Sequence, residues 1–253
     1  MKPAAIGRIL FWRHGSLWIG LAGEPSGMHA HHAVQITLPF PGNRVRLQGP
    51  DEDWREFAAA IVAANQPHGF EARGQHVAQI FLDPESRAGR VLQREFRDKG
   101  IEALPLGQLE PLVAKLASGY RQRVADGDLP EQAAAVVETL AGAVSSAAHE
   151  SDKRIASALA IIRKRLGGAL SLDDVAAEVH LSPDRFRHLF IAETGVAFRA
   201  YLLWLRLECA LTAYVAGNTL TEAAHIGGFA DSAHFSRTFR RMFGIAPASV
   251  RPE

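Results

Sequence analysis

Histidines gather near the N-terminus in the stretch His29-Ala30-His31-His32, and clustered imidazoles can bind ligands. Side chains alternate between the two faces of a β-strand, so His29, His31 and Gln35 would share one face of a strand. His32 would point to the other face. Neutral imidazoles bind Zn²⁺, Ni²⁺ or Fe²⁺, and they also hydrogen-bond organic ligands. A later segment around His68 could supply a further histidine to the same site.

The histidine stretch is similar to the metal-binding motif of cupin barrels, in which His-x-His is followed four residues later by Glu. Gln35 stands in place of that Glu, and an amide is a weaker metal ligand than a carboxylate. Two occupants therefore stay open: a divalent metal held by His29, His31 and His68, or an organic effector that hydrogen-bonds these histidines and Gln35. A third arrangement leaves the histidines in solvent, because a shift of one residue in strand register reverses every face.

A second set of chemistry-bearing residues lies in a motif that occurs twice. The copies are SLDDVAAEVHLSPDRFRHLFIAETG, from Ser171, and TLTEAAHIGGFADSAHFSRTFRRMFG, from Thr219. Each copy predicts a short Ala-rich helix, a turn and a second helix, which is the outline of a helix-turn-helix unit. Aromatic residues at helical spacing, such as Phe186 with Phe190, give each second helix an apolar stripe. A helix predicted from about Phe198 to Ala216 joins the copies.

Residues Lys153 to Arg251 resemble the DNA-binding domain of the AraC/XylS family of bacterial transcription regulators. Both copies carry the resemblance, above all IGGFADSAHFSRTFRRMFGIAPASVR, together with Arg206 and Ala210 in the joining helix. The departures are small: Val196-Ala197 follow Gly195, and a Gly-Gly pair follows Ile226. The resemblance implies promoter binding, a ligand-sensing N-terminal domain, a homodimer and, for an activator, contact with RNA polymerase.

The same resemblance places the DNA contacts on the outward sides of the two second helices. We predict that the following residues contact DNA: Asp184, Arg185, Arg187, His188, Ser232, Ala233, Ser236, Arg237 and Arg240. Arg187 is the residue most suited to pair with guanine through two hydrogen bonds. The joining helix would span roughly 28 Å, and successive major-groove faces of B-DNA lie about 34 Å apart. One chain could therefore address two consecutive major grooves.

At 253 residues the chain suits two domains, which we place at residues 1–150 and 151–253. The net charge is +1, and 47% of the residues are hydrophobic, as in ordinary globular proteins. Residues 1–150 hold 15 Lys and Arg against 17 Asp and Glu, whereas residues 151–253 hold 13 against 10. Because the C-terminal domain is only mildly basic, helix geometry must contribute more to DNA binding than bulk charge does.

The sequence also argues against several classes of protein. The single cysteine, Cys209, cannot form an intrachain disulfide, which fits a reducing compartment. No apolar run approaches the ~20 residues of a membrane span and none suits a signal peptide, so we predict a cytoplasmic protein. No P-loop or Gly-x-Ser-x-Gly motif is present, so we do not expect an enzyme. The alternative is a metal-sensing regulator, or a metal-dependent cupin enzyme fused to a DNA-binding domain.

The predicted fold class is α+β, with a cupin-like β-barrel or sandwich followed by an all-α domain. Period-2 alternation predicts strands in six segments: GRILFW, SLWIGLAG, HAVQITLPF, NRVRLQ, AAIVAANQ and HVAQIFLD. A helix starting at Asp83-Pro84 and two more, at about 109–124 and 130–148, follow. These helices pack either on their own barrel or on a second subunit, and the family resemblance favours a dimerisation segment at about 84–148. A link at 145–151 then leads to a helix opened by Asp152.

Overall fold

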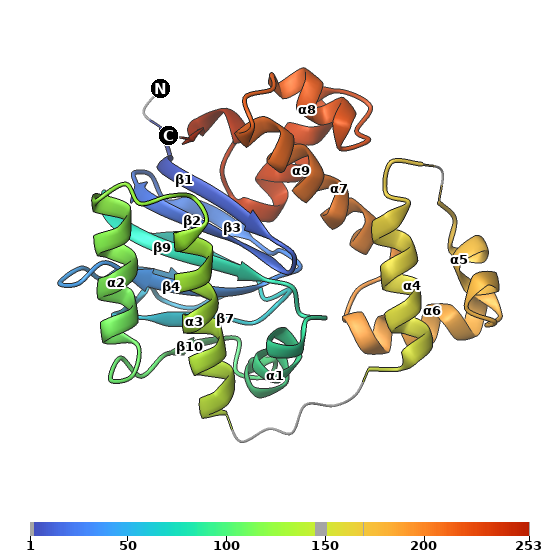
Figure 1. Cartoon of the computed structure of the whole chain (residues 1–253), viewed down its shortest axis with the longest axis horizontal. Helices are drawn as coiled ribbons and strands as arrows, with labels where there is room; N and C mark the ends of the chain where they lie inside the picture. The colour runs from blue at the N-terminus through green and yellow to red at the C-terminus, as the bar shows by residue number, and fades with distance from the viewer. Residues whose placement is uncertain (1–2, 145–150, 169, 253) are drawn as a thin grey trace. The chain divides into compact units, whose positions relative to one another are not determined.

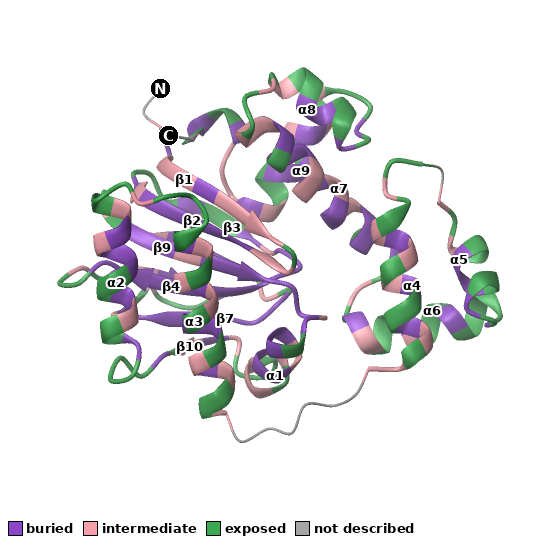
Figure 2. Ribbon diagram, viewed as in Figure 1, coloured by how far each residue is buried: buried purple, intermediate pink, exposed green. Residues whose placement is uncertain are grey.

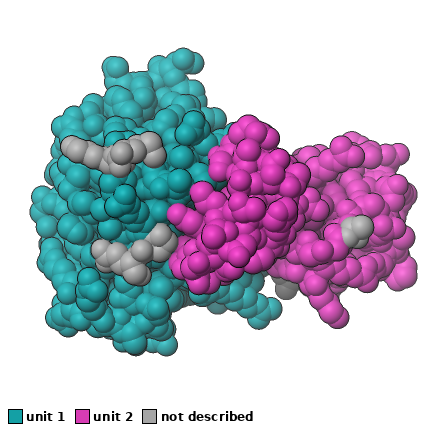
Figure 3. All heavy atoms as spheres, turned by 90° about the horizontal axis from the view of Figure 1, so that it is seen from above, with its two compact units in different colours: residues 1–148, 239–253 teal, residues 149–238 magenta. Residues whose placement is uncertain are grey.

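The computed structural model describes residues 3–144, 151–168 and 170–252 (Figure 1). The chain divides into two compact units, coloured separately in Figure 3: residues 1–148 together with 239–253, and residues 149–238. The first unit therefore includes the last residues of the chain, which the sequence assigns to the C-terminal domain. The predicted link at 145–151 lies, apart from Ser151, outside the described residues.

The strands of the first unit form two sheets. The larger sheet has the strand order β10-β7-β4-β9-β2-β1-β11, and the smaller has the order β3-β8-β5-β6. The bounds are β1 Ala5–Trp12, β2 Gly15–Ala22, β3 Ser26–His29, β4 Val34–Pro39, β5 Val45–Gln48, β6 Arg55–Phe57, β7 Ala60–Val62, β8 His68–Glu71, β9 Gln75–Leu82, β10 Ile101–Ala103 and β11 Val250–Pro252.

Each of the six predicted segments contains a strand: β1, β2, β4, β5, β7 or β9. The prediction misses β3, β6, β8, β10 and β11, which have three or four residues and are too short to show a clear alternation. The sheets do not close into one barrel. Instead, Val45 and Phe70 of the smaller sheet share an apolar cluster with Val62 and Val77 of the larger. The fold is therefore an open, two-sheet form of the expected cupin-like domain.

Three helices follow β9 in the first unit: α1 Arg87–Phe96, α2 Glu110–Arg121 and α3 Asp128–Ala143. The predicted start of α1 at Asp83-Pro84 is wrong. The helix begins after Ser86, whose hydroxyl accepts a hydrogen bond from Gly89 N at 2.9 Å. The Asp83 carbonyl accepts hydrogen bonds from the Ser86 amide and hydroxyl, so the residues before Ser86 form a turn rather than helix.

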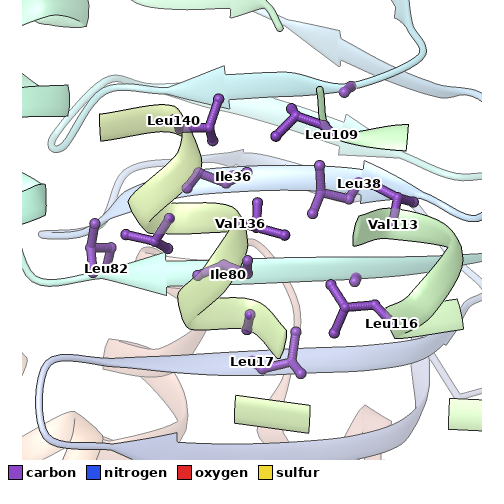
Figure 4. Packing of buried hydrophobic residues seen from close by; sticks show 14 of the residues in the cluster. Leu17, Ile36, Leu38, Ile80, Leu82, Leu109, Val113, Leu116, Val136 and Leu140 are labelled. Carbon is purple, nitrogen blue, oxygen red and sulfur yellow. The ribbon is translucent and has the colours of Figure 1, made fainter. Parts of the chain in front are cut away.

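Helices α2 and α3 cover one face of the larger sheet (Figure 4). The apolar cluster there joins residues of the helices to residues of the strands: Leu109, Val113, Leu116, Val136 and Leu140 with Leu17, Ile36, Leu38, Ile80 and Leu82. In Figure 2 both helices show buried residues on one side and exposed residues on the other. The apolar stripes that the sequence offered to a second subunit therefore pack on the chain's own sheet.

The second unit is helical. Its helices are α4 Lys153–Lys164, α5 Leu172–Glu178, α6 Pro183–Thr194, α7 Phe198–Val215, α8 Leu220–Ile226 and the start of α9, which spans Ser232–Phe243. Asp152 caps α4 as predicted, because its carboxylate accepts a hydrogen bond from Arg154 N. Among the described residues, no helix is both long and apolar enough to span a membrane.

Helix α9 ends in the first unit, because the division between the units falls between Thr238 and Phe239. After α9, a 3₁₀ turn at Pro247–Ser249 leads into β11, which pairs in parallel with β1. The register places Val250 beside Ala5. The chain's last strand thus extends the larger sheet beyond the strand that begins the chain.

Candidate functional site

Three buried histidines meet in the first unit. His29 is the last residue of β3, His31 lies in the turn before β4, and His68 begins β8. His29 and His68 are cross-strand neighbours in the β3–β8 pair. One ring nitrogen of each histidine lies within 4.8 Å of the others. The cluster contains the histidines chosen from the sequence, but the expectation that one strand runs from His29 to Gln35 is wrong, since β3 ends at His29.

Strand β4 supplies a fourth buried polar side chain to this cluster, that of Gln35. Ile36 and Leu38 pack with α2 and α3, so by alternation Gln35 and Thr37 point to the opposite face of the sheet. Gln35 Oε1 lies 2.9 Å from His31 Nε2 and 3.2 Å from His68 Nε2. Gln35 Nε2 donates a hydrogen bond to Thr37 Oγ1 at 2.9 Å.

The backbone orients all three imidazole rings. His29 Nδ1–H donates to Gly27 O at 2.7 Å, His31 Nδ1–H to Ala33 O at 3.1 Å, and His68 Nδ1–H to Gln66 O at 2.9 Å. A carbonyl oxygen can only accept, so each Nδ1 carries the proton and each Nε2 is left with a lone pair when the ring is neutral.

Burial keeps these rings neutral. Desolvation lowers the pKa of His31 to about 3, and the neighbouring His29 adds to the effect by charge repulsion. Desolvation likewise lowers the pKa of His29 below its usual value and that of His68 well below it. At neutral pH all three side chains therefore present a lone pair rather than a positive charge, which is the form that binds metals or accepts hydrogen bonds.

A cavity of about 50 Å³ adjoins the cluster. His29, Gln35 and Phe81 contribute to its lining, and Phe243 and Ile245 of the C-terminal segment contribute as well. Pockets for drug-sized organic ligands usually measure roughly 300–1,000 Å³. This cavity holds only a small occupant unless the C-terminal segment moves.

Aromatic stacking attaches the end of α9 to the sheet beside the cluster. Trp18 of β2 stacks on Phe243, with ring centroids 4.9 Å apart, and on Phe239 at 6.2 Å. Phe243 also lies 5.9 Å from the His31 ring. Gly27 N donates a hydrogen bond to Gly244 O at 3.2 Å, and the Gly27 carbonyl is the group that orients His29. The end of α9 therefore contacts the site directly.

Trp18 and Phe243 are site residues that the sequence pattern does not predict. A signal for Phe243 exists, because it follows Phe239 by four residues and continues the apolar stripe of α9. Trp18 gives no such signal, since an apolar residue within a strand is typical of any core. The sequence alternation predicts that His32 lies apart from the other histidines, and its Nε2 lies 2.6 Å from the Glu85 carboxylate rather than in the cluster.

The first helix-turn-helix unit consists of α5 and α6. Ser182 caps α6 by accepting a hydrogen bond from Arg185 N, and Gly195 ends the helix with a φ of 76°. Phe186 and Phe190 are buried, as the apolar stripe predicts. The predicted DNA-contact residues of α6 are all exposed: Asp184, Arg185, Arg187 and His188. Arg187 is not isolated, because its guanidinium lies 2.6 Å from the Asp184 carboxylate.

The second helix-turn-helix unit consists of α8 and α9. Thr219 and Glu222 form a capping box at the start of α8, and Asp231 caps α9 by accepting a hydrogen bond from His234 N at 2.6 Å. Phe235 is buried and lies against Phe229. Among the predicted DNA-contact residues, Ala233, Arg237 and Arg240 are exposed, while Ser232 and Ser236 are half-buried. Two of the five predicted contact residues of α9 are therefore less accessible than those of α6.

Comparison with known proteins assigns the C-terminal part of the chain. A helix-turn-helix domain family matches residues 175–253. The HTH-type transcriptional regulator GlxA of Rhizobium meliloti is 29% identical over 245 residues, which are 93% of this chain and 74% of GlxA. The transcriptional activator NphR of a Rhodococcus species is 30% identical over 181 residues, 71% of this chain and 50% of NphR. The chain spans about a third of the length of several other curated relatives that it matches.

Solved structures extend the similarity in fold to both units. A crystal structure of ToxT from Vibrio cholerae aligns with a TM-score of 0.61 and 11% sequence identity, covering 93% of this chain and 97% of ToxT. The alignment supports the α+β arrangement of a sheet-rich N-terminal region and a helical C-terminal region. The helix-turn-helix units predicted from the repeated motif are confirmed by the family match and by the helices themselves.

Proposed function

Because this chain carries an AraC-type helix-turn-helix domain, we propose that it is a ligand-responsive bacterial transcription regulator that binds promoter DNA. The observation that carries this proposal is the pair of helix-turn-helix units with capped second helices. Each second helix buries its aromatic residues and exposes basic ones. Helix α7, which joins the two helix-turn-helix units, has 18 residues and is roughly 27 Å long. This length suits two helix-turn-helix units that bind consecutive major grooves.

The proposed base contacts lie on α6, with Arg187 pairing with a guanine. This pairing requires Arg187 to exchange its ion pair with Asp184 for the base, and an exposed ion pair of this kind contributes only about 0.2–1 kcal/mol. Arg237 is the corresponding candidate on α9, and Arg240 would contact phosphate. We propose that a small effector binds in the first compact unit, to residues that are not among the proposed DNA contacts.

The histidine cluster is the proposed effector site, lined by His29, His31, Gln35 and His68. Its connection to α9 supports this assignment, since Gly27 bridges His29 and Gly244 by hydrogen bonds. An occupant that moves His29 or His31 would alter how the end of α9 packs, and α9 carries five of the nine proposed DNA-contact residues. A ToxT structure holds an unsaturated fatty acid. A ligand of that size would not fit the cavity of about 50 Å³ in this chain.

The remaining parts of the proposal concern partners and location. We place the regulator in the cytoplasm, without enzymatic activity, and as a homodimer that contacts RNA polymerase if it activates transcription. The apolar sides of α2 and α3 are covered by the chain's own sheet, so a dimer would use their outer surfaces. The second candidate function is a metal-sensing regulator or a metal-dependent cupin enzyme, and the histidine cluster is the observation that favours it.

Footprinting of the full chain on the DNA upstream of its own gene and neighbouring genes tests the proposal. We expect protection of two consecutive major grooves per chain, and an Arg187→Ala variant should need a higher protein concentration to give it. Lys115→Ala provides the matched control, because Lys115 is an exposed cation on α2 in the other unit. Protection of a single major groove would overturn the two-unit model, and no sequence-selective protection on any fragment would overturn the function.

A further inference from the structure

We propose that His29, His31 and His68 bind a divalent transition-metal ion through their Nε2 atoms, with Gln35 Oε1 as a fourth ligand. The proposal rests on the proposed function only in naming the occupant of its effector site. It follows from the direction of the hydrogen bonds around the cluster, the chemistry of the four donor atoms and the size of the cavity beside them.

Lone pairs gather at the histidine cluster. Each Nδ1–H donates to a backbone carbonyl, so the Nε2 atom of each neutral ring is an acceptor. The group that faces His31 Nε2 and His68 Nε2 is Gln35 Oε1, which is also an acceptor, because Gln35 uses its NH₂ group for Thr37. Gln35 Oε1 lies 2.9 Å from His31 Nε2 and 3.2 Å from His68 Nε2, so a cation placed among these three atoms would meet a lone pair of each.

Lone pairs on nitrogen and oxygen are the ligands of a metal ion, and ring nitrogens of three histidines and the amide oxygen of Gln35 lie close together here. The backbone hydrogen bonds then have the role usual for metal-binding histidines, in which the other ring nitrogen donates to a carbonyl that fixes the tautomer and the ring orientation.

The donor atoms of the cluster fit one class of metal ion. Three imidazoles and one carbonyl-type oxygen suit Zn²⁺, Co²⁺, Ni²⁺ or Fe²⁺, whereas Mg²⁺ and Ca²⁺ prefer carboxylates and water. No carboxylate belongs to the cluster among the described residues. One ring nitrogen of each histidine lies within 4.8 Å of the others, so an ion central to these three nitrogens would lie at most about 2.8 Å from each. Bonds of ~2.0–2.1 Å therefore need each ring to move by less than about 1 Å.

The cavity beside the histidines is small. A cavity of about 50 Å³ accommodates an ion with a water ligand, and that water would hydrogen-bond within a partly polar lining that includes His29, Gln35 and Ser26. An organic effector that contacts all three histidines needs a pocket several times larger. The alternative to a metal ion is a hydrogen-bond donor, either a water or the Gln35 NH₂ group after rotation of the amide. In that case Gln35→Glu would not tighten Zn²⁺ binding.

Metal titration of the full chain tests the proposal. The protein is stripped with chelator and titrated with Co²⁺, followed by optical spectroscopy, and then with Zn²⁺ in competition. We expect one ion per chain, the intense visible bands of four-coordinate Co²⁺, and at least a hundredfold weaker binding when His29, His31 and His68 are all replaced by Gln. His76→Ala is the matched control, because His76 is an exposed histidine on β9 outside the cluster, and it should bind metal like the unmodified chain.

A second variant makes the result independent of any folding defect in the triple variant. Gln35→Glu supplies a carboxylate to the same position and should tighten Zn²⁺ binding at least tenfold, since carboxylate is the better ligand. If the folded wild-type chain binds no Co²⁺ or Zn²⁺ at micromolar concentration, the metal site is refuted. Equal binding by the wild-type chain and the Gln35→Glu and triple variants would also refute it, because the ion would then lie elsewhere.

The failures of the two proposals are distinguishable in the same samples. Footprinting of the metal-free chain reports whether it binds DNA, whatever the titration shows. DNA protection without metal binding would leave a regulator with a different occupant at the cluster. Metal binding without sequence-selective protection would retain the site and remove the regulatory function.

Discussion

Helices α6 and α9 are equivalent parts of the repeated motif, but their last turns lie in different surroundings. Phe186 and Phe190 of α6 correspond to Phe235 and Phe239 of α9, so the residue that corresponds to Thr194 is Phe243. The Thr194 hydroxyl donates to the Phe190 carbonyl of its own helix at 2.7 Å. Phe243 instead stacks on Trp18 and lies beside the histidine cluster.

The difference teaches how a repeated DNA-binding motif can acquire a specialised copy. In α6 the last turn satisfies its hydrogen bonds internally, and the helix belongs wholly to the second unit. In α9 the last turn belongs to the first unit, where an aromatic residue and a glycine contact the sheet. We therefore expect α6 to contribute constant DNA affinity and α9 to contribute the part that responds to the histidine cluster.

The largest expected effect is that of Phe243→Thr, which gives α9 the residue found in α6. Loss of a buried aromatic ring should lower the free energy of unfolding by about 3 kcal/mol. Urea unfolding measures this change, and hydrogen exchange should show faster exchange of the β11 amides. Ile191→Thr on α6 is the control: this side chain is 41% exposed, so the change should stay within about 0.5 kcal/mol. Unaltered exchange in β11 would mean that Phe243 does not hold the C-terminal segment.

Gly244→Ala should have the next largest effect, about 2 kcal/mol of destabilisation. The φ of Gly244 is +71°, and an added Cβ would lie 2.5 Å from Gly27 O and 2.9 Å from His29 Nδ1. Gly217→Ala at the end of α7 is the matched control, because its φ of +98° strains alanine too but the space around it is open. Unfolding curves of the two variants measure the difference. Equal destabilisation would show that backbone strain alone matters and that the approach to His29 does not.

A smaller effect is expected for base recognition by α6. Arg187→Ala should reduce discrimination at one base pair about tenfold, or about 1.4 kcal/mol, because one bidentate contact with guanine is lost. Binding of the full chain to a promoter fragment and to its single-base variants measures this change. Arg237→Ala tests the equivalent position of α9. If Arg187→Ala weakens binding to every fragment equally, Arg187 contacts phosphate and reads no base.

The smallest expected effect is that of Asp184→Asn, less than about 1 kcal/mol in DNA affinity. The substitution removes the ion pair that holds Arg187 and also removes a negative charge near the DNA, so affinity should rise slightly. Titrations at two salt concentrations measure the change, which should be greater at low salt because exposed charges are screened. Weaker binding at both concentrations would indicate that Asp184 itself accepts a hydrogen bond from a base.

The sequence by itself determines the helical domain almost residue by residue. The signals there are local: Ser182 and Asp152 cap helices, Gly195 ends one, and Phe186 with Phe190 marks the side that must be buried. Each signal depends on residues within one or two turns of helix, so it can be recognised without knowledge of the rest of the chain. The alternating segments of the sheet were predicted for the same reason.

Only the tertiary structure decides what each apolar or polar face meets. His68 lies 39 positions after His29 along the chain, and strand pairing of β3 with β8 brings them together. The apolar stripes of α2 and α3 could have packed against a second subunit, and Phe243 could have packed against residues of its own helix-turn-helix unit. An apolar face gains free energy from burial against any complementary surface, so its pattern fixes that it is buried but not by what. Long-range strand pairing and packing make that choice, and here they bring the end of α9 to the histidines.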